Sequence, residues 1–145
     1  MTLVEILVVL AVIAMLAGMV LVVTLRVENQ SSEATVANVF ALLRSALREY
    51  YDFTGGFPDP NDAGNRIERM YAALESVPAS RELLRGIDSI LVQRLDDPRT
   101  AKMYDPWGTR FDYLYDSEDD SFPTLVSAGP DKKFGTADDI RSKGK

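Results

Sequence analysis

The sequence predicts an α+β protein, in which one long N-terminal helix is followed by a small head of short helices and an antiparallel sheet. Two observations predict this fold class. Positions 2–53 contain no proline and a single glycine, and their apolar residues fit a helix. Further along, two segments alternate around aromatic residues and are bounded by turn residues, as strands are.

The first 25 residues form an apolar segment, and from Leu3 to Leu25 its only charged residue is Glu5. A helix of this length is about 35 Å long, whereas the apolar core of a bilayer is about 30 Å thick. No basic residue precedes the segment, and it is longer than the apolar part of a secretory signal. We therefore expect residues 1–25 to cross a membrane once and residues 26–145 to form a globular head.

Glu5 is a costly residue in such a segment, because a lone carboxylate in hydrocarbon must pair, protonate or lie near the interface. Two interpretations stay open on composition. Glu5 could be an assembly residue that pairs with the N-terminal amine of Met1, best placed on a neighbouring chain. It could instead lie among lipid headgroups at the helix N-terminus, where the helix dipole favours a negative charge.

The helix is expected to continue into the head. Apolar residues there recur at intervals of three and four, which places on one face Val36, Phe40, Leu43, Leu47 and Tyr50. This pattern predicts a helix over about 2–53 whose second half packs on its own domain. Gly55 suits the left-handed cap of a helix, and Pro58 cannot continue one.

The remaining chain predicts short elements. Two helices are expected at about Ala63–Ser76 and about Ser80–Leu95, separated by Pro78. An irregular segment, two strands of a two- to three-stranded antiparallel sheet and a C-terminal loop are expected, in this order, at 96–109, 110–116, 122–128 and 129–140. The only tryptophan, Trp107, lies between proline and glycine, and we expect it to pack on the core rather than to form a binding platform.

The composition argues against several functions. The chain contains neither His nor Cys, so it lacks an imidazole base, a thiol and the commonest zinc ligands. Its acidic runs at 96–97 and 118–120 are better explained as solvated turns than as acid–base pairs. We predict that the protein is not an enzyme, with a membrane-anchored enzyme or binding module as the rival. A net charge of −6 makes nucleic acid an unfavourable primary partner.

Three aspartates, Asp131, Asp138 and Asp139, bracket Gly135 in the C-terminal loop. Calcium takes about six to eight oxygen ligands from carboxylates and backbone carbonyls, and a loop that folds back on itself can supply both. The alternative is a solvated acidic loop whose aspartates stabilise turns. The residue pattern alone leaves both interpretations open.

Four segments together resemble the type IV pilin superfamily, and most of all the major pseudopilin of type II secretion systems. The segments are TLVEILVVLAVIAMLAGMVLVV at the N-terminus, ALREYYDFTGGFPD at the helix end, YDPWGTRFDY before the first strand and SAGPDKKFGTADDI in the acidic loop. The first of them resembles the whole superfamily. The tryptophan turn and the acidic loop together are much more specific to the pseudopilin.

The resemblance implies a lollipop-shaped, membrane-anchored subunit of a fibre. A prepilin peptidase would remove a leader, so that Met1 becomes the first residue and its amine is methylated. Subunits would wait in the bacterial inner membrane with the head in the periplasm. They would then polymerise with minor pseudopilins, on an inner-membrane assembly platform, into a periplasmic helical filament that drives protein export. The alternative within the superfamily is a major type IV pilin of an extracellular fibre for adhesion, motility or DNA uptake.

The resemblance also assigns residues. Glu5 would neutralise the amine of Met1 on a neighbouring subunit. Calcium would be held by the side chains of Asp131 and Asp138, with Asp139, and by backbone carbonyls near Ala128 and Phe134. The chain departs from many family members in three places, where it has Met1, Ala14 and Val22 in place of Phe, Gly and Pro. Gly18 is therefore the remaining weak point of the first helix.

Overall fold

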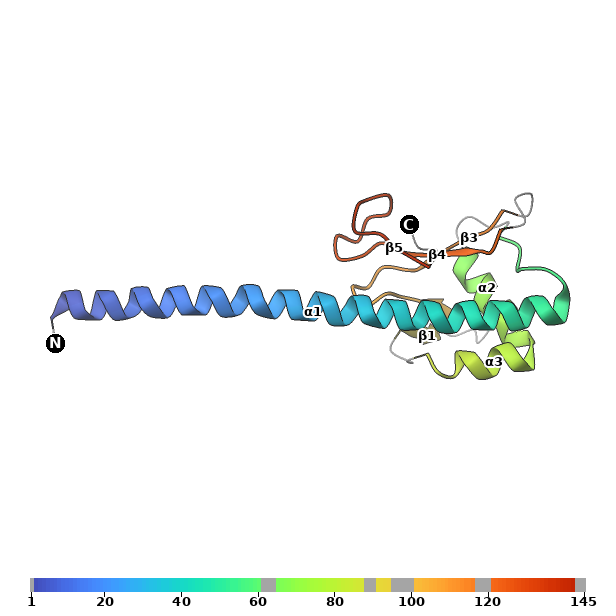
Figure 1. Cartoon of the computed structure of the whole chain (residues 1–145), viewed down its shortest axis with the longest axis horizontal. Helices are drawn as coiled ribbons and strands as arrows, with labels where there is room; N and C mark the ends of the chain where they lie inside the picture. The colour runs from blue at the N-terminus through green and yellow to red at the C-terminus, as the bar shows by residue number, and fades with distance from the viewer. Residues whose placement is uncertain (1, 61–64, 88–90, 95–100, 117–120, 143–145) are drawn as a thin grey trace. The chain divides into compact units, whose positions relative to one another are not determined.

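The computed structural model describes residues 2–60, 65–87, 91–94, 101–116 and 121–142, and of residues 20–29 and 93–94 it describes the backbone only. The described chain has an α+β fold with three helices and five short strands. It divides into two compact units, Met1–Ser32 and Glu33–Lys145. The first unit is helical, and the second contains all the strands (Figure 1).

Helix α1 spans Leu3–Thr54, which confirms the helix predicted over about 2–53. It ends where Gly55 adopts the left-handed conformation, with φ of 80°. The N–H of Gly55 donates to the carbonyl oxygen of Tyr51 over 2.8 Å, so the predicted glycine cap is also confirmed. Among the residues whose side chains are described, no helix is both long and apolar enough to cross a membrane.

The core of the second unit is built on the predicted face of α1. Tyr50 on this face is partly buried. The other four residues expected there have at most 3% of their surface exposed: Val36, Phe40, Leu43 and Leu47. Each buried side chain of this kind contributes about 1.5–3 kcal/mol to folding. The periodicity of the helix therefore positions the head through its apolar face.

Two short helices pack on this core. Helix α2 spans Arg66–Ser76 and helix α3 spans Pro78–Leu84. Pro78 is the first residue of α3, a position where its missing N–H costs nothing. The predicted start of α2 at Ala63, with its cap, lies outside the described residues.

The third helix was predicted to reach Leu95, and this is wrong beyond Leu84. After Leu84 the backbone hydrogen bonds join residues three apart instead of four. One of them runs from the N–H of Gly86 to the carbonyl oxygen of Leu83 over 3.1 Å, and the α-helix ends at Leu84. Strand β1, Val92–Arg94, follows and pairs antiparallel with strand β2, Ala101–Met103. Short apolar runs fit helix and strand equally well, so periodicity could not separate them.

Strand β2 also corrects the prediction that 96–109 is irregular, because Ala101–Met103 forms a ladder within it. Its side chains alternate between buried and half-buried, and Met103 is fully buried. Three residues are too few for the alternation to stand out from the surrounding loop. The acidic pair at 96–97 lies outside the described residues.

The second sheet confirms the two strands expected near the C-terminus. Strand β3, Asp112–Leu114, pairs antiparallel with β4, Thr124–Ser127, and β4 pairs with β5, Ile140–Arg141. In Figure 1 this sheet and α3 lie on opposite sides of the C-terminal half of α1. The acidic loop is the connection from β4 to β5, so the sheet fixes both of its ends.

Hydrogen bonds join the sheet to the long helix and to the segment that follows it. The Arg44 guanidinium donates to the carbonyl oxygen of Ser142 over 3.0 Å. Ser142 in turn accepts from the N–H of Leu125 through its hydroxyl, over 2.8 Å. The buried hydroxyl of Tyr113 donates to the carbonyl of Pro58 over 2.9 Å, and burial raises the pKa of Tyr113 far above its ordinary value.

Candidate functional site

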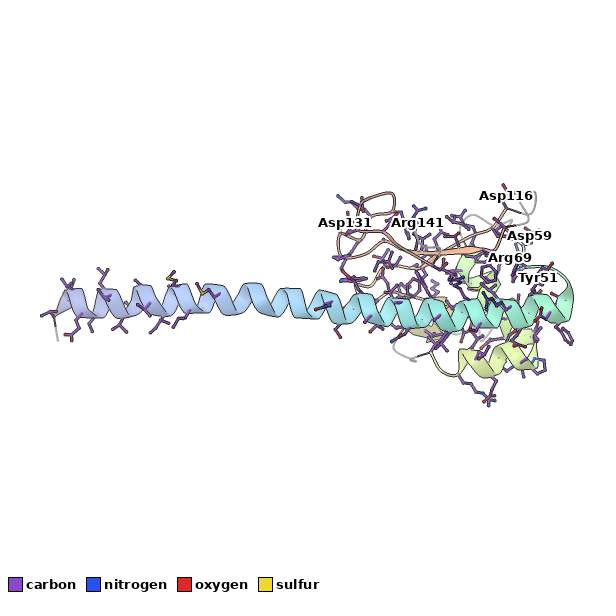
Figure 2. The ribbon with its side chains drawn as sticks, viewed as in Figure 1. Tyr51, Asp59, Arg69, Asp116, Asp131 and Arg141 are labelled. Carbon is purple, nitrogen blue, oxygen red and sulfur yellow. The ribbon has the colours of Figure 1, made fainter. Side chains whose placement is uncertain are left out.

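The N-terminal part of α1 exposes an unusual amount of apolar surface. Twelve large apolar side chains between Leu3 and Met19 are exposed, from 45% for Ile6 to 81% for Leu3. Figure 2 shows side chains projecting around this part of the helix. Soluble monomers rarely expose apolar surface on this scale, and such a surface marks contact with a membrane or with another protein.

Glu5 and Thr2 bond to each other at the start of this helix. The N–H of Thr2 donates to Glu5 Oε2, and the N–H of Glu5 donates to Thr2 Oγ1, both over 3.3 Å. This reciprocal pair is a capping box, which the pattern Thr-x-x-Glu at positions 2–5 could have revealed. Glu5 therefore has a local partner within its own chain. The predicted partner is the amine of Met1 on a neighbouring chain, and Met1 lies outside the described residues.

The acidic loop from Ala128 to Asp139 folds back on itself around one carboxylate. The N–H of Asp131 and the hydroxyl of Thr136 donate to the two oxygens of Asp138, the former over 3.1 Å. The hydroxyl of Thr136 and then the N–H of Asp131 hold the pKa of Asp138 below its ordinary value. Asp131 accepts from the N–H of Lys133 over 2.8 Å. The turn needs left-handed backbone at Lys132 and Gly135, among others.

Asp139 is the buried member of the three aspartates. Its side chain is 4% exposed, and its Oδ2 accepts from the N–H of Gly135 over 3.0 Å and from Arg141 over 3.2 Å. Its other oxygen, Oδ1, is buried and has no hydrogen-bond partner among the described residues. A buried carboxylate oxygen without a partner is costly, so this atom is suited to a bound cation.

The five residues predicted to bind calcium all lie in or beside this loop, but they do not form a finished site. Asp131 and Asp138 are joined through the N–H of Asp131, and Ala128 is fully buried at the end of β4. Within the described residues no three acidic side chains converge as metal ligands. The oxygen donors and the unpartnered oxygen of Asp139 suit a hard cation chemically. The loop would have to tighten around the ion.

Asp105 is a functional candidate that the sequence analysis missed. It is 2% exposed, and its Oδ1 accepts from the N–H of Trp107 over 3.2 Å and of Thr109 over 2.8 Å. Its Oδ2 accepts from the hydroxyl of Ser127 on β4 over 2.7 Å. The sequence Asp105-Pro106-Trp107-Gly108 is a turn signal, because aspartate, proline and glycine all favour turns. Trp107 packs against the core, as predicted.

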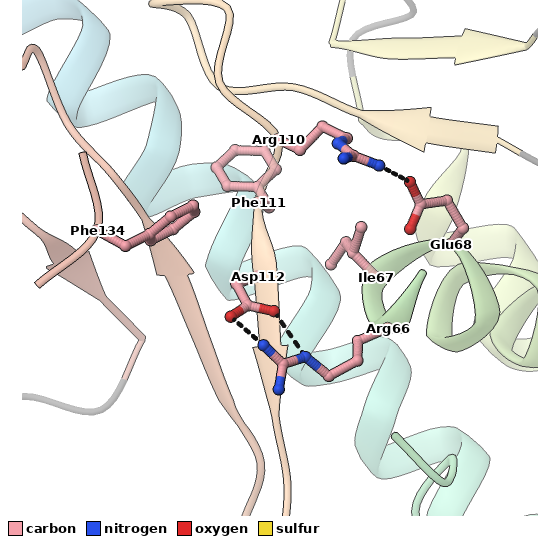
Figure 3. Close-up of a pocket in the computed structure, with 7 residues that line it drawn as sticks. All are labelled: Arg66, Ile67, Glu68, Arg110, Phe111, Asp112 and Phe134. Carbon is pink, nitrogen blue, oxygen red and sulfur yellow. Dashed lines mark hydrogen bonds and ion pairs between the residues drawn. The ribbon is translucent and has the colours of Figure 1, made fainter. Parts of the chain in front are cut away.

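A pocket of about 230 Å³ lies between α2, β3 and the acidic loop (Figure 3). Its floor contains Ile67 and Phe111, and the ring of Phe134 reaches it from the loop. Two ion pairs line it: Arg66 with Asp112, where the closest atoms are 2.7 Å apart, and Arg110 with Glu68, where they are 3.3 Å apart. The charges cancel in pairs, so the pocket presents ion pairs rather than a single acid or base.

Two further predictions stay without a structural outcome. The acidic run at 118–120 lies outside the described residues, as does the pair at 96–97.

Comparison with protein-family models, with curated proteins and with solved structures finds no match to this chain. Its function must therefore be inferred from its own residues, above all from the exposed apolar helix and the acidic loop.

Proposed function

We propose that this chain is the major subunit of a type II secretion pseudopilus, a helical filament that drives protein export from the periplasm. The observation that carries the proposal is the apolar helix from Leu3 to Met19, whose side chains are exposed while the head has its own core. Lipid would cover this surface before assembly, and the same segment of neighbouring subunits would cover it afterwards. The four pseudopilin-like segments of the sequence support the same function.

In this proposal the subunit is pilin-like, with a single pass through the bacterial inner membrane and its head in the periplasm. Its main partner is a second copy of itself. Minor pseudopilins, the inner-membrane platform and the prepilin peptidase act on it during assembly. Glu5 neutralises the amine of Met1 on a neighbour, because a carboxylate inside an apolar bundle needs a compensating charge.

The acidic loop is proposed to bind calcium. Asp131, Asp138 and Asp139 would supply carboxylate oxygens, and carbonyls at Ala128 and Phe134 would complete the ligands. The support is the buried, unpartnered oxygen of Asp139 and the folding of the loop around Asp138. When bound, the ion would offset the carboxylate charges and hold the loop against the sheet.

The test of the filament is a pair of substitutions at Glu5. Glu5→Ala removes both the charge and the helix cap, whereas Glu5→Gln keeps an oxygen that can accept from the N–H of Thr2. If Glu5 acts by charge, both variants insert into the membrane but neither forms filaments. Filaments are counted by electron microscopy of sheared cells, beside subunit levels in the membrane fraction.

Glu33→Gln is the matched control, because Glu33 is an exposed glutamate on the same helix within the head. It should assemble like the unmodified chain. Normal filaments from Glu5→Gln would show that Glu5 acts only as a helix cap. Absence of filaments from the unmodified chain, in cells that carry a complete secretion system, would refute the proposed function itself.

A further inference from the structure

Buried hydrogen bonds run from the tryptophan turn to the acidic loop. Asp105 Oδ2 accepts from the hydroxyl of Ser127 over 2.7 Å, and the same hydroxyl oxygen accepts from the N–H of Gly129 over 3.2 Å. Asp105 is 2% exposed and Ser127 is 0% exposed. Because neither group can turn to solvent, Asp105 Oδ2 and the Ser127 hydroxyl satisfy each other's hydrogen bonding. The hydroxyl of Ser127 uses both its donor and its acceptor capacity in this link.

Gly129 connects these hydrogen bonds to the aspartates, because its backbone packs against that of Asp138. Its φ is 68°, and a Cβ atom built on it would lie 2.4 Å from the carbonyl oxygen of Asp138 and 3.2 Å from Asp138 Oδ2. The backbone of Gly129 therefore lies directly against that of Asp138, which precedes the buried Asp139. The hydrogen bond from the Gly129 N–H to the Ser127 hydroxyl thus positions the backbone that packs against Asp138.

We propose that Asp105 is a positioning residue for the acidic loop. Through Ser127 and Gly129 it sets the placement of Asp138 and Asp139, and it couples cation binding in the loop to the turn that holds Trp107. The coupling to a cation rests on the proposed function, whereas the positioning of the loop does not. Because such coupling is reciprocal, a cation in the loop would also stabilise the turn.

The two oxygens of Asp105 have different partners, so its role in positioning the loop can be tested separately from its role in closing the turn. Oδ1 accepts from the N–H groups of Trp107 and Thr109 within the turn, whereas Oδ2 accepts from the hydroxyl of Ser127 on β4. Ser127→Ala removes the second link without adding volume and leaves the first intact. A structural effect on the turn and an effect on the loop can therefore be measured separately.

The experiment uses the full chain in detergent micelles, with two readouts. The first is amide hydrogen exchange of residues 129–139 with a chelator present. Ser127→Ala should make the protected amides of this loop exchange roughly threefold to tenfold faster, the change expected when one buried hydrogen bond is lost. The second readout is tryptophan emission during a calcium chloride titration, in which Trp107 is the only source.

In the unmodified chain calcium should change the emission of Trp107, and in Ser127→Ala this response should be lost while the turn amide of Thr109 stays protected. Ser45→Ala is the matched control, because it removes a hydroxyl that donates to Ala41 on the exposed face of α1. Asp105→Asn is the second variant, used if Ser127→Ala does not fold. It should release the same loop amides.

Unchanged exchange of the loop in a folded Ser127→Ala or Asp105→Asn variant would overturn the positioning role, whether or not calcium binds. A calcium-dependent emission change that persists in both variants would overturn the coupling. If the unmodified chain shows no calcium binding by thermal shift, the calcium site and the coupling are refuted together. The exchange measurement then still decides the positioning of the loop.

Discussion

Asp138 and Asp139 are adjacent in sequence but have different surroundings. Asp138 is half-buried, and each of its two oxygens accepts a hydrogen bond, from the hydroxyl of Thr136 and from the N–H of Asp131. Asp139 is almost fully buried and keeps one oxygen without a partner. The resemblance assigned Asp131 and Asp138 as the main carboxylate ligands and Asp139 as an additional one, because residue type and spacing contain no information about burial. In the structure Asp139 is the residue with most to gain from a cation.

The calcium proposal predicts a thermal shift. Free calcium at about a hundredfold excess over its Kd should raise the unfolding free energy by about 2.7 kcal/mol, which is on the order of 10 °C in the melting temperature. Asp131→Ala should abolish this shift, and Asp52→Ala, on an exposed position of α1, should retain it. Differential scanning fluorimetry with calcium or chelator checks both variants. Equal melting temperatures of the unmodified chain in the two conditions would refute the site.

The lowered pKa of Asp138 predicts a dependence of stability on acid. The pKa in the folded state is below the ordinary value of 3.8, so the ionised carboxylate stabilises the loop at higher pH. This contribution is complete above about pH 4 and is lost as the pH falls through the folded-state pKa. Asp138→Asn should remove the part of the decline below pH 4.

Urea denaturation between pH 5 and pH 2.5, with chelator present, measures this effect. Asp52→Asn is the control and should follow the unmodified chain. The idea fails if Asp138→Asn loses as much stability between these pH values as the unmodified chain does.

At the scale of elements, the helix α1 and the strands β3 and β4 could be predicted, whereas β1 and β2 could not. The apolar residues from Val36 to Tyr50, with Leu43 and Leu47 among them, recur over several helical turns, so their period is clear. The runs at Val92 and Ala101 are three residues long, and only their pairing with each other makes them strands. Pairing between distant segments is a tertiary property that one sequence does not display.

The same limit explains the candidate site. The acidic loop and the turn at Trp107 could be located from residue types alone. The bond from Asp105 to Ser127 joins residues 22 positions apart, and it exists because β4 lies beside the turn. The capping box at Thr2 and Glu5 is different, since its pattern Thr-x-x-Glu is local and can be recognised from the sequence.

The loop geometry predicts a large difference between two glycines. Gly129→Ala places a methyl group 2.4 Å from the carbonyl oxygen of Asp138, in addition to the strain of a positive φ. Gly135→Ala has a similar φ of 85° but no atom within 4 Å of the added methyl. We expect about 1 kcal/mol of destabilisation at Gly135 and at least about 2 kcal/mol more at Gly129.

Equilibrium urea unfolding of the full chain in micelles measures the two free energies, and Gly135→Ala serves as the matched control. Equal losses at the two positions would mean that the close approach of Gly129 to Asp138 does not contribute to stability.

At the scale of the whole molecule, the two compact units differ in whether their apolar side chains are buried. The unit Glu33–Lys145 contains a buried core, whereas the unit Met1–Ser32 consists of helix with exposed apolar side chains. The face of α1 that supports the head begins at Val36, beyond the apolar segment. The sequence predicted this division through its change from uniform to periodic hydrophobicity. The sequence places the boundary after residue 25, where the uniformly apolar run ends, whereas the compact units divide after Ser32 because the helix continues without a break.

This division predicts that the head folds without the apolar segment. A chain that lacks residues 1–25 should be monomeric in detergent-free buffer and should unfold cooperatively, because the core residues from Val36 onward are all retained. The full chain should need detergent. Analytical ultracentrifugation and circular dichroism check both statements. A shortened chain that aggregates or lacks a cooperative transition would contradict them.

The bond from Arg44 to Ser142 has a consequence for the timing of synthesis. The two residues are separated by 98 positions, so the ribosome must add that much chain after Arg44 before the bond can form. At elongation rates of about 5 to 20 residues per second this takes roughly 5 to 20 s. During that interval the apolar face of the helix has left the ribosome without the strands that will cover it. The nascent head therefore exposes this apolar face to proteolysis and aggregation for seconds.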